Sequence, residues 1–467
     1  MLVDFYGFVT QLLYLLLIEN DMKGKSEMKK NGWALVPFGV FAVFYVGLSL
    51  YADHCGYPMP WYKVPMPIAF IVASAVALGF GKDKLDRKVD VYAAGMGETN
   101  IMIMSLIFIL AGAFATIAKG SGAVDAAVAI ARNFIPSRLM VAGVFLVSCF
   151  ISTAIGTSCG TIAAVTPIAL GFAGPLGLSP AFLIGAVVGG AMFGDNLSMI
   201  SDTTIAATRT QGVRMKDKFI ANFFLALPAA LVSLAIYAVK GAAVAEVAAP
   251  SIGWQEWVLI IPYGMVLVLA LVGFNVMALL FSGSLLSAII GFALGKFGFF
   301  DALDFIGKGT LGMSETLIVA ILAGGLFKFV QSEGGFAWLT EKISSLVRGP
   351  RSCEAGVGAL VGAINCFTAN NTVAIVIAGP IARECSERFG ANPVRVASVL
   401  DTVSCVVQGL IPYGAQILIA IGVARGLDLE VESFELLKCL YYQPLLLVAV
   451  VVWLVLGGRS LRKSASA

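Results

Sequence analysis

Apolar runs long enough to cross a lipid bilayer recur along almost the whole of this chain. A spanning helix needs about 20 predominantly apolar residues, and helices satisfy their own backbone hydrogen bonds inside the bilayer. The 467 residues are 59% hydrophobic and 13% charged, with a mean hydropathy of +0.92, which excludes an ordinary soluble domain. The net charge of +3 gives no reason to expect nucleic acid as a partner. The sequence therefore predicts an all-α polytopic membrane protein, with membrane lipid around it.

Two halves of five spans each account for these runs. The first half covers 33–240 and the second 254–457, with a linker at 241–253, an N-terminal segment at 1–32 and a cytoplasmic tail at 458–467. We predict spans at 33–53, 62–80, 99–119, 181–208, 218–240, 254–273, 275–296, 316–331, 393–424 and 437–457, and broken apolar stretches at 139–176 and 354–389. The apolar segment 5–18 is short for a span. An interfacial helix, a short extra span and a position upstream of the true start remain open for it.

The order of these elements occurs twice. Residues 95–99, Gly-Met-Gly-Glu-Thr, open one span, and residues 312–316, Gly-Met-Ser-Glu-Thr, open its counterpart. Each is followed by a broken stretch that carries Pro-Ile-Ala, at Pro167 and at Pro380. An odd number of spans in each half inverts the second half relative to the first, and ligands bind at mid-membrane in such repeats.

Basic residues occupy the short loops on one side of the predicted topology, which is the cytoplasmic side by the positive-inside rule. They are Lys82, Lys84, Arg87 and Lys88, then Arg209, Arg214, Lys216 and Lys218, and finally Arg459, Arg462 and Lys463. This count predicts which loops between spans lie on the cytoplasmic side, and it predicts that the first broken stretch enters from the outer side.

Two carboxylates lie in the polar segment 193–204, which directly follows a glycine-rich apolar run. Each of Asp195 and Asp202 costs roughly 3 kcal/mol at bilayer depth unless it is paired or solvated. Ser198 and Thr203 lie between and beside them. This polar density predicts that the helix opens near Gly194 and turns backbone carbonyls toward a cavity within the protein.

The broken stretches are typical of re-entrant hairpins, because small and hydroxyl-bearing residues interrupt two short apolar arms. The first tip spans 152–161 and the second 368–372. The candidate binding residues at the tips are Thr157, Ser158, Thr161, Asn370, Asn371 and Thr372. Polar side chains can instead hydrogen-bond neighbouring helices and serve only packing, and this alternative stays open for each hydroxyl.

A third intramembrane carboxylate, Asp401, begins a second polar break at 400–414. Ser404 follows it on the same segment, and Pro412 removes one intrahelical hydrogen bond and frees a carbonyl. A purely structural role for Asp401, paired with a nearby donor, remains the alternative.

Residues 194–204 resemble the Gly-Asp-x-x-Ser-x-x-Ser-Asp-Thr-Thr signature of the NhaC-type sodium/proton antiporters. Residues 156–161 and 401–413 resemble that family's first hairpin and second broken helix. The resemblance implies two inverted repeats with re-entrant hairpins, a multi-pass protein of the bacterial inner membrane, and often a homodimer. It also implies that Asp195, Asp202, Thr203 and Asp401 bind the transported cation. The chain departs from the family pattern by carrying Asn196, Met199, Ala397 and Leu400.

The chemistry of these residues suits exchange of sodium against protons. Sodium is a hard cation that prefers oxygen ligands, which carboxylates, hydroxyls and carbonyls supply. A buried carboxylate can hold a proton or a sodium ion near neutral pH, but not both. We therefore expect sodium at Asp195, Asp202 and Asp401, with Ser198, Thr203 and Ser404 completing the site. Exchange of a small organic acid or amino acid, coupled to sodium or protons, is the alternative.

An enzyme is disfavoured, because the chain lacks a histidine within its predicted spans. The eight cysteines show no paired spacing, and His54 is the sole histidine, so we expect no metal cofactor. Sodium enters only as a transported ion.

Overall fold

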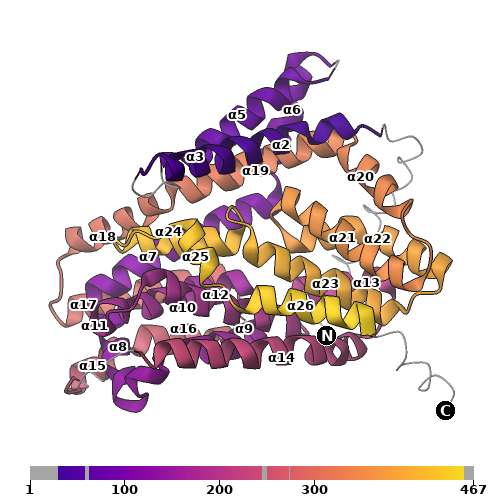
Figure 1. Ribbon diagram of the computed structural model, residues 1–467. Helices are drawn as coiled ribbons and strands as arrows, with labels where there is room; N and C mark the ends of the chain where they lie inside the picture. The colour runs from indigo at the N-terminus through magenta and orange to yellow at the C-terminus, as the bar shows by residue number, and fades with distance from the viewer. Residues whose placement is uncertain (1–29, 58–62, 82, 244–249, 273, 457–467) are drawn as a thin grey trace, which may run out of the picture.

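The computed structural model describes residues 30–57, 63–81, 83–243, 250–272 and 274–456, and every regular element within these ranges is helical (Figure 1). Eight helical segments there are long and apolar enough to cross a membrane, and shorter apolar helices accompany them. The prediction of an all-α polytopic protein is confirmed. The segment 5–18 and the tail 458–467 lie outside the described residues.

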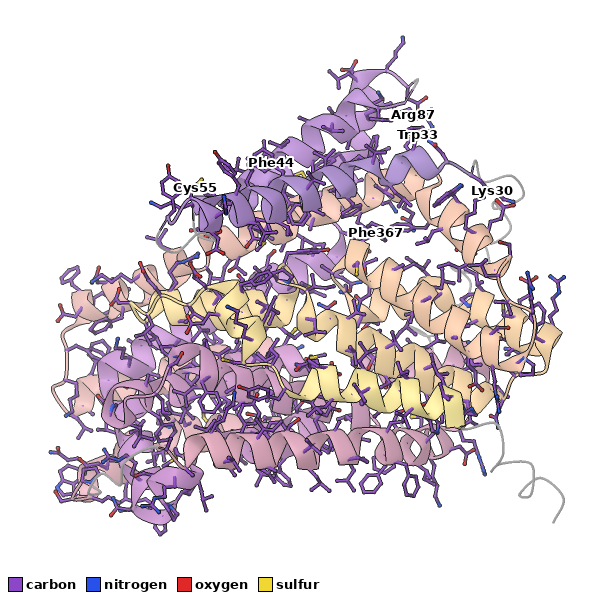
Figure 2. All side chains as sticks on the ribbon, in the orientation of Figure 1. Lys30, Trp33, Phe44, Cys55, Arg87 and Phe367 are labelled. Carbon is purple, nitrogen blue, oxygen red and sulfur yellow. The ribbon has the colours of Figure 1, made fainter. Side chains whose placement is uncertain are left out.

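A peripheral layer runs along one side of the molecule, where an N-terminal group of helices packs against a helix from the second half of the chain (Figure 1). It comprises η1 (Gly32–Leu35), α2 (Val36–Ala42), η2 (Val43–Gly47), α3 (Leu48–His54), α5 (Met66–Gly79), α6 (Leu85–Met96) and α19 (Ser314–Ser332). The first four form one continuous helical segment, as predicted for the first span. Phe38 of α2 contacts Phe367 of α21 (Pro350–Thr368), with ring centroids 4.7 Å apart, and so ties this layer to the second hairpin. Figure 2 labels Phe367 below the peripheral layer.

The remaining helices form a second group at one end and a central core. The end group comprises α7 (Thr99–Ser121), α8 (Ala123–Phe134), α15 (Trp254–Leu259), α16 (Ile261–Leu271), α17 (Val276–Ala293) and α18 (Phe299–Gly312). The core comprises η3 (Ser137–Leu139), α9 (Met140–Ile155), α10 (Ser158–Gly171), α11 (Ala173–Leu176), α12 (Pro180–Leu197), α13 (Asp202–Gln211), α14 (Met215–Gly241), α20 (Gly335–Ser344), α21 (Pro350–Thr368), α22 (Asn371–Phe389), α23 (Pro393–Leu410), α24 (Ala415–Gly426), α25 (Ser433–Lys438) and α26 (Tyr442–Leu456).

The order of helices in the first half recurs in the second. A helix pair, a short helix, a hairpin, a broken helix and a final span appear as α6 to α14 and again as α18 to α26. The packing between halves is reciprocal, since α7 packs on α18 and α6 on α19, while α10 packs on α24 and α13 on α22. Inversion of the second half across the membrane remains a prediction that this packing supports.

Two segments differ from the sequence prediction. The region around Arg132, for which we predicted neither a span nor a broken stretch, is helix α8, whose alanine-rich face is buried against the bundle while Asp125 faces outward. Helix α18, which precedes the predicted span 316–331, was also missed. Both helices carry charges that lower their mean hydropathy, so neither was recognised as a span. The contacts of α8 with α15 and of α18 with α7 are evident only from the structure.

Helix α14 has the polarity of a membrane helix, with its apolar face outward. Phe224, Leu231 and Val239 recur at intervals of about two helical turns and are 71%, 55% and 74% exposed. The opposite face buries Asn222 and Ser233 completely. A helix surrounded by water would place these two kinds of side chain the other way round. The outer face of α14 therefore contacts lipid.

Glycines allow α7 and α18 to cross with their backbones in contact. A Cβ added at Gly309 would lie 2.1 Å from the carbonyl oxygen of Gly112, and one at Gly112 would lie 2.2 Å from that of Gly309. Such close approach between small residues is a common way for membrane helices to associate.

We expect Gly309→Ala to destabilise the protein by about 1–3 kcal/mol, since the new methyl group can fit only if the two backbones separate. Gly307→Ala on the same helix is the matched control, because a Cβ there meets nothing within 4 Å. The control should change stability by less than about 1 kcal/mol. Thermal unfolding of the purified variants measures both effects. Equal stability of the two variants would contradict the tight crossing.

Candidate functional site

Four interruptions of the helices are joined by side-chain hydrogen bonds in the middle of the core. They are the hairpin tips at 156–157 and 369–370 and the helix breaks at 198–201 and 411–414. The predicted interruptions are thus present in all four segments. The first helix break lies after Asp195, whereas we had expected the helix to open near Gly194.

Close packing of α12 on the first hairpin brings Asp195 to the hairpin tip. A Cβ at Gly194 would lie 2.3 Å from Cβ of Ser152 and 2.4 Å from the backbone nitrogen of Thr153, so only glycine permits this approach. Ser152 also donates a hydrogen bond of 2.6 Å to the carbonyl oxygen of Ala191. This packing places the Asp195 side chain beside the tip of the first hairpin.

Asp195 is 5% exposed and accepts one hydroxyl on each carboxylate oxygen. Ser158, the first residue of α10, donates to Oδ2 at 2.7 Å, and Ser201 of the helix break donates to Oδ1 at 2.6 Å. The hydroxyl of Thr203 lies 2.8 Å from that of Ser201. A buried charge is tolerable only when its oxygens are hydrogen-bonded in this way.

Two buried glutamines connect the hairpin tips across the molecule. Gln416 of α24 donates to the Ser158 hydroxyl at 3.0 Å, and its Oε1 accepts from Nε2 of Gln408 at 2.8 Å. Gln408 also donates to the carbonyl oxygen of Ala369 at 2.8 Å. Ala369 ends α21 with φ of 48°, a left-handed conformation that non-glycine residues rarely adopt. This glutamine relay links Asp195 to the second hairpin.

The second carboxylate, Asp401, is fully buried and forms an ion pair with Lys218 of α14. Asn222, one turn further along α14, donates to Oδ2 of Asp401 at 2.8 Å and to Oδ1 of Asn196 at 2.7 Å. Lys218, 1% exposed, also donates to the carbonyl oxygen of Asn196 at 3.1 Å and to the Thr204 hydroxyl at 2.6 Å. The Lys218–Asp401 pair therefore lies next to the residue that follows Asp195.

The sequence assigned Lys218 to a cytoplasmic loop, and that assignment is wrong. The lysine lies at the edge of an apolar run, so position along the chain could not separate it from the exposed basic residues Arg214 and Lys216. Its partner Asp401 is remote in sequence and becomes adjacent only when α14 packs on α23. Asn222, Gln408 and Gln416 were also missed. Their one signal is a large polar side chain inside a span-length apolar segment.

The other predicted residues divide into two sets. Thr203 belongs to the Asp195 cluster. Ser404 and Ser198 are buried but form only local hydrogen bonds. Ser404 donates to the Asp401 carbonyl oxygen at 2.9 Å, and the Ser198 hydroxyl accepts from the Ile200 amide at 3.3 Å. At the first tip, Ser158 donates to Asp195, and the Thr161 hydroxyl donates to the Thr157 carbonyl oxygen. At the second tip, the Asn370 side chain accepts from the Val373 amide, and the Asn371 side chain accepts from the Thr372 amide. The Asn371 side-chain nitrogen also lies 4.0 Å from the Cys405 sulfur.

Asp202 stands apart from these clusters. It is the first residue of α13, and its side chain is exposed. A continuous helix would place residues seven apart on one face, but the break at 198–201 separates Asp202 from that register. Asp195 and Asp202 thus occupy different environments, one buried and hydrogen-bonded and the other open.

Charge and oxygen ligands define what the clusters can hold. Asp195, Asp401 and Lys218 sum to one negative charge when ionised, which a single monovalent cation would balance. Two buried amide oxygens near the second tip, Asn365 Oδ1 and Gln408 Oε1, lack a hydrogen-bond partner. Among the described residues, no three His, Cys, Asp or Glu side chains converge as a transition-metal site would require. The donor set is one of oxygen, suited to a hard cation.

Comparison with known proteins assigns the family. The profile of the Na+/H+ antiporter family matches residues 66–242 and 235–458, which together include both clusters and both hairpins. The chain belongs to the Na+/H+ antiporter family. The resemblance seen in the signature 194–204 is confirmed, and the family is one of transporters, not enzymes. Spans and bacterial relatives are those of a multi-pass protein of the inner membrane.

The relatives that this chain resembles are named for different substrates. The chain is 26% identical over 386 residues to the Na+/H+ antiporter NhaC of Bacillus subtilis, covering 75% of this chain and 84% of the relative. It is 25% identical over 425 residues to the arginine/ornithine antiporter ArcD of Halobacterium salinarum, covering 82% and 84%. It is 26% identical over 215 residues to the malate-2H+/Na+-lactate antiporter of Bacillus subtilis, covering 44% and 42%. All three are antiporters, which supports secondary antiport here.

Proposed function

We propose that this protein exchanges Na+ for protons and that Asp195 is the group that holds one or the other. The observation that carries the proposal is the burial of Asp195 between a hairpin tip and a helix break, with a hydroxyl on each oxygen. Ser158 and Ser201 each donate a hydrogen bond to the carboxylate. A hydroxyl also has lone pairs, so both can rotate and present oxygen to a bound sodium ion.

Asp401 has a different role in this proposal. The sequence predicted a second sodium site there, but the ammonium group of Lys218 occupies the position beside the carboxylate that such an ion would need. Lys218 therefore acts as a fixed counter-charge, and Asp195 alone is left to exchange. Asp202, predicted as an exchange group, is exposed and carries no part of the proposed step.

Alternating exposure completes the exchange. The hairpin tips and helix breaks come from both halves of the chain, so a movement of helices around their junction would open Asp195 to one side or the other. A proton taken up on one side and released on the other in return for sodium needs only that the two ligands exclude each other. Membrane lipid surrounds this machinery, and a homodimer remains a prediction.

A dequenching assay in proteoliposomes tests the proposal. Vesicles with an imposed pH gradient should lose it saturably on addition of Na+, to a smaller extent with Li+, and not with K+. Addition of amino acids or small organic acids together with Na+ examines the alternative function. Dissipation that requires an organic solute, or that is equal for K+ and Na+, would replace sodium/proton exchange by that alternative or by a channel.

A further inference from the structure

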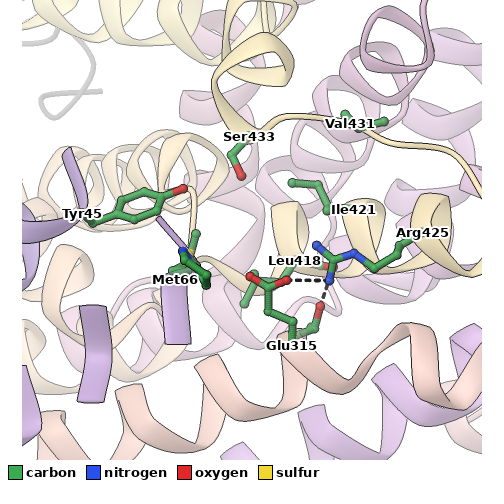
Figure 3. Close-up of a pocket in the computed structure, with 10 residues that line it drawn as sticks. Tyr45, Met66, Glu315, Leu418, Ile421, Arg425, Val431 and Ser433 are labelled. Atoms are coloured by element: carbon green, nitrogen blue, oxygen red, sulfur yellow. Dashed lines mark hydrogen bonds and ion pairs between the residues drawn. The ribbon is translucent and has the colours of Figure 1, made fainter. Parts of the chain in front are cut away.

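A cavity outside the Asp195 cluster contains a pair of opposite charges. It has a volume of about 120 Å³ and is bordered by helices of the peripheral layer, by α24 and by the segment before α25. Glu315 of α19 and Arg425 of α24 both line it and form a direct ion pair at its wall, with Oε2 and Nη1 2.8 Å apart (Figure 3). Their side chains are 35% and 33% exposed, so both remain accessible from the cavity.

The walls of the cavity combine apolar groups with hydroxyls. Met66, Leu418 and Ile421 supply apolar surface, and the hydroxyls of Tyr45 and Ser433 point toward the same space (Figure 3). Small-molecule sites commonly combine largely apolar walls with a few polar groups that fix orientation. At about 30 Å³ per water molecule, the volume corresponds to about four waters, which suits a ligand of only a few heavy atoms.

The charge arrangement selects for a ligand that carries both signs. A guanidinium has five N–H donors and a carboxylate several lone pairs, so each group can serve a ligand as well as its neighbour. A simple anion would approach Arg425 but meet the like charge of Glu315, and a simple cation would meet the reverse. A small zwitterion satisfies both. We propose that this cavity binds a small amino acid, with its carboxylate at Arg425 and its ammonium group at Glu315.

The position of the cavity places the ligand beside the broken helix. Arg425, Ile421 and Leu418 lie along one face of α24, and Leu418 is two residues from Gln416 of the glutamine relay. Thr316, next to Glu315, donates to the Leu418 carbonyl at 3.2 Å and holds α19 against this part of α24. The amino-acid site is separate from Asp195 and does not depend on the proposed sodium/proton exchange.

Calorimetric titration of the purified full-length protein tests the proposal with matched probes. Glycine, L-alanine and β-alanine carry both charges, whereas propionate and propylamine carry one charge each at comparable size. At least one zwitterion should bind saturably and about tenfold or more tightly than either single-charge probe. Binding by none of the zwitterions, or equal binding by propionate or propylamine, would overturn the proposal.

Variants locate the binding. Arg425→Gln and Glu315→Gln should each weaken zwitterion binding about tenfold or more, and Ile421→Phe should block it by filling the cavity without altering charge. Asp304→Asn, in an exposed ion pair with Lys308, is the matched control and should bind normally. Size-exclusion profiles identify a misfolded variant. If all the correctly folded cavity variants bind as the wild type does, the site is refuted.

Asp195→Asn separates the two proposals. It should lose sodium-dependent proton flux yet keep zwitterion binding. Loss of zwitterion binding in this variant would refute an independent site, whereas wild-type protein that binds a zwitterion but shows no sodium-dependent flux would refute only the exchange at Asp195.

Discussion

Asp195→Asn is expected to reduce sodium-dependent proton flux to background while the protein still inserts into the membrane. Asparagine keeps the shape of the side chain and can accept from Ser158 or Ser201, but it carries no charge and cannot release a proton. Both halves of the proposed exchange are therefore removed by a near-isosteric change. Proteoliposomes with an internal pH-sensitive dye, challenged with a series of Na+ concentrations, provide the measurement.

Asp202→Asn is the matched control for this experiment, since it makes the same chemical change seven residues away at an exposed position. We expect it to retain most of the flux. Ser158→Ala adds a graded test, because loss of one hydroxyl should raise the Na+ concentration needed for half-maximal flux without abolishing exchange. Full activity of Asp195→Asn, or inactivity of Asp202→Asn alone, would assign the exchange to the exposed carboxylate.

Lys218→Met is expected to destabilise the protein by about 3–5 kcal/mol, because it leaves the buried charge of Asp401 without its partner. Removing both charges, as Lys218→Met with Asp401→Leu, should recover most of that loss, since buried pairs can often be replaced by apolar residues at little net cost. Unfolding temperatures of the purified single and double variants measure the difference. High Na+ should stabilise the single variant more than the wild type, as sodium takes the place of the ammonium group.

Lys308→Met supplies the comparison at the surface. Lys308 pairs with Asp304 at 2.8 Å, but both side chains are more than half exposed, and such pairs contribute about 0–1 kcal/mol. The double variant at the buried site should also lack any sodium-specific stabilisation beyond that of the wild type. A Lys218→Met protein as stable as Lys308→Met would mean that Asp401 is solvated or protonated, contrary to the proposed role of Lys218.

Local composition predicted the interruptions of the helices well. The two hairpin tips and the two breaks each concentrate hydroxyls, amides or glycine inside an apolar run, and such a run can lose its helical hydrogen bonds only where other groups replace them. The hydroxyl-rich segment 152–161 was therefore recognisable without knowledge of its neighbours. The same reasoning singled out Asp195 and Asp401, which are both buried in the structure.

Pairing across the fold could not be predicted in this way. The basic residue in the helix of Asp401, Arg395, pairs with Glu354, and Lys218 reaches Asp401 from α14 instead. The position of Asp202 depended on where the helix ends, and a shift of the break to 198–201 moved this carboxylate away from the cluster. Element boundaries are the least certain part of any prediction from sequence, and here they decide which carboxylate is buried.

The attachment of Asp401 to Lys218 restricts how the protein can move. Lys218 belongs to the first half of the chain and Asp401 to the second. Separating them would leave two unpaired charges buried in the protein interior, where water cannot solvate them. In the proposed exchange we therefore expect helices α14 and α23 to move together as one rigid body. We expect the helices that shift during transport to do so at contacts other than the one between α14 and α23, and the hinge to lie outside this contact.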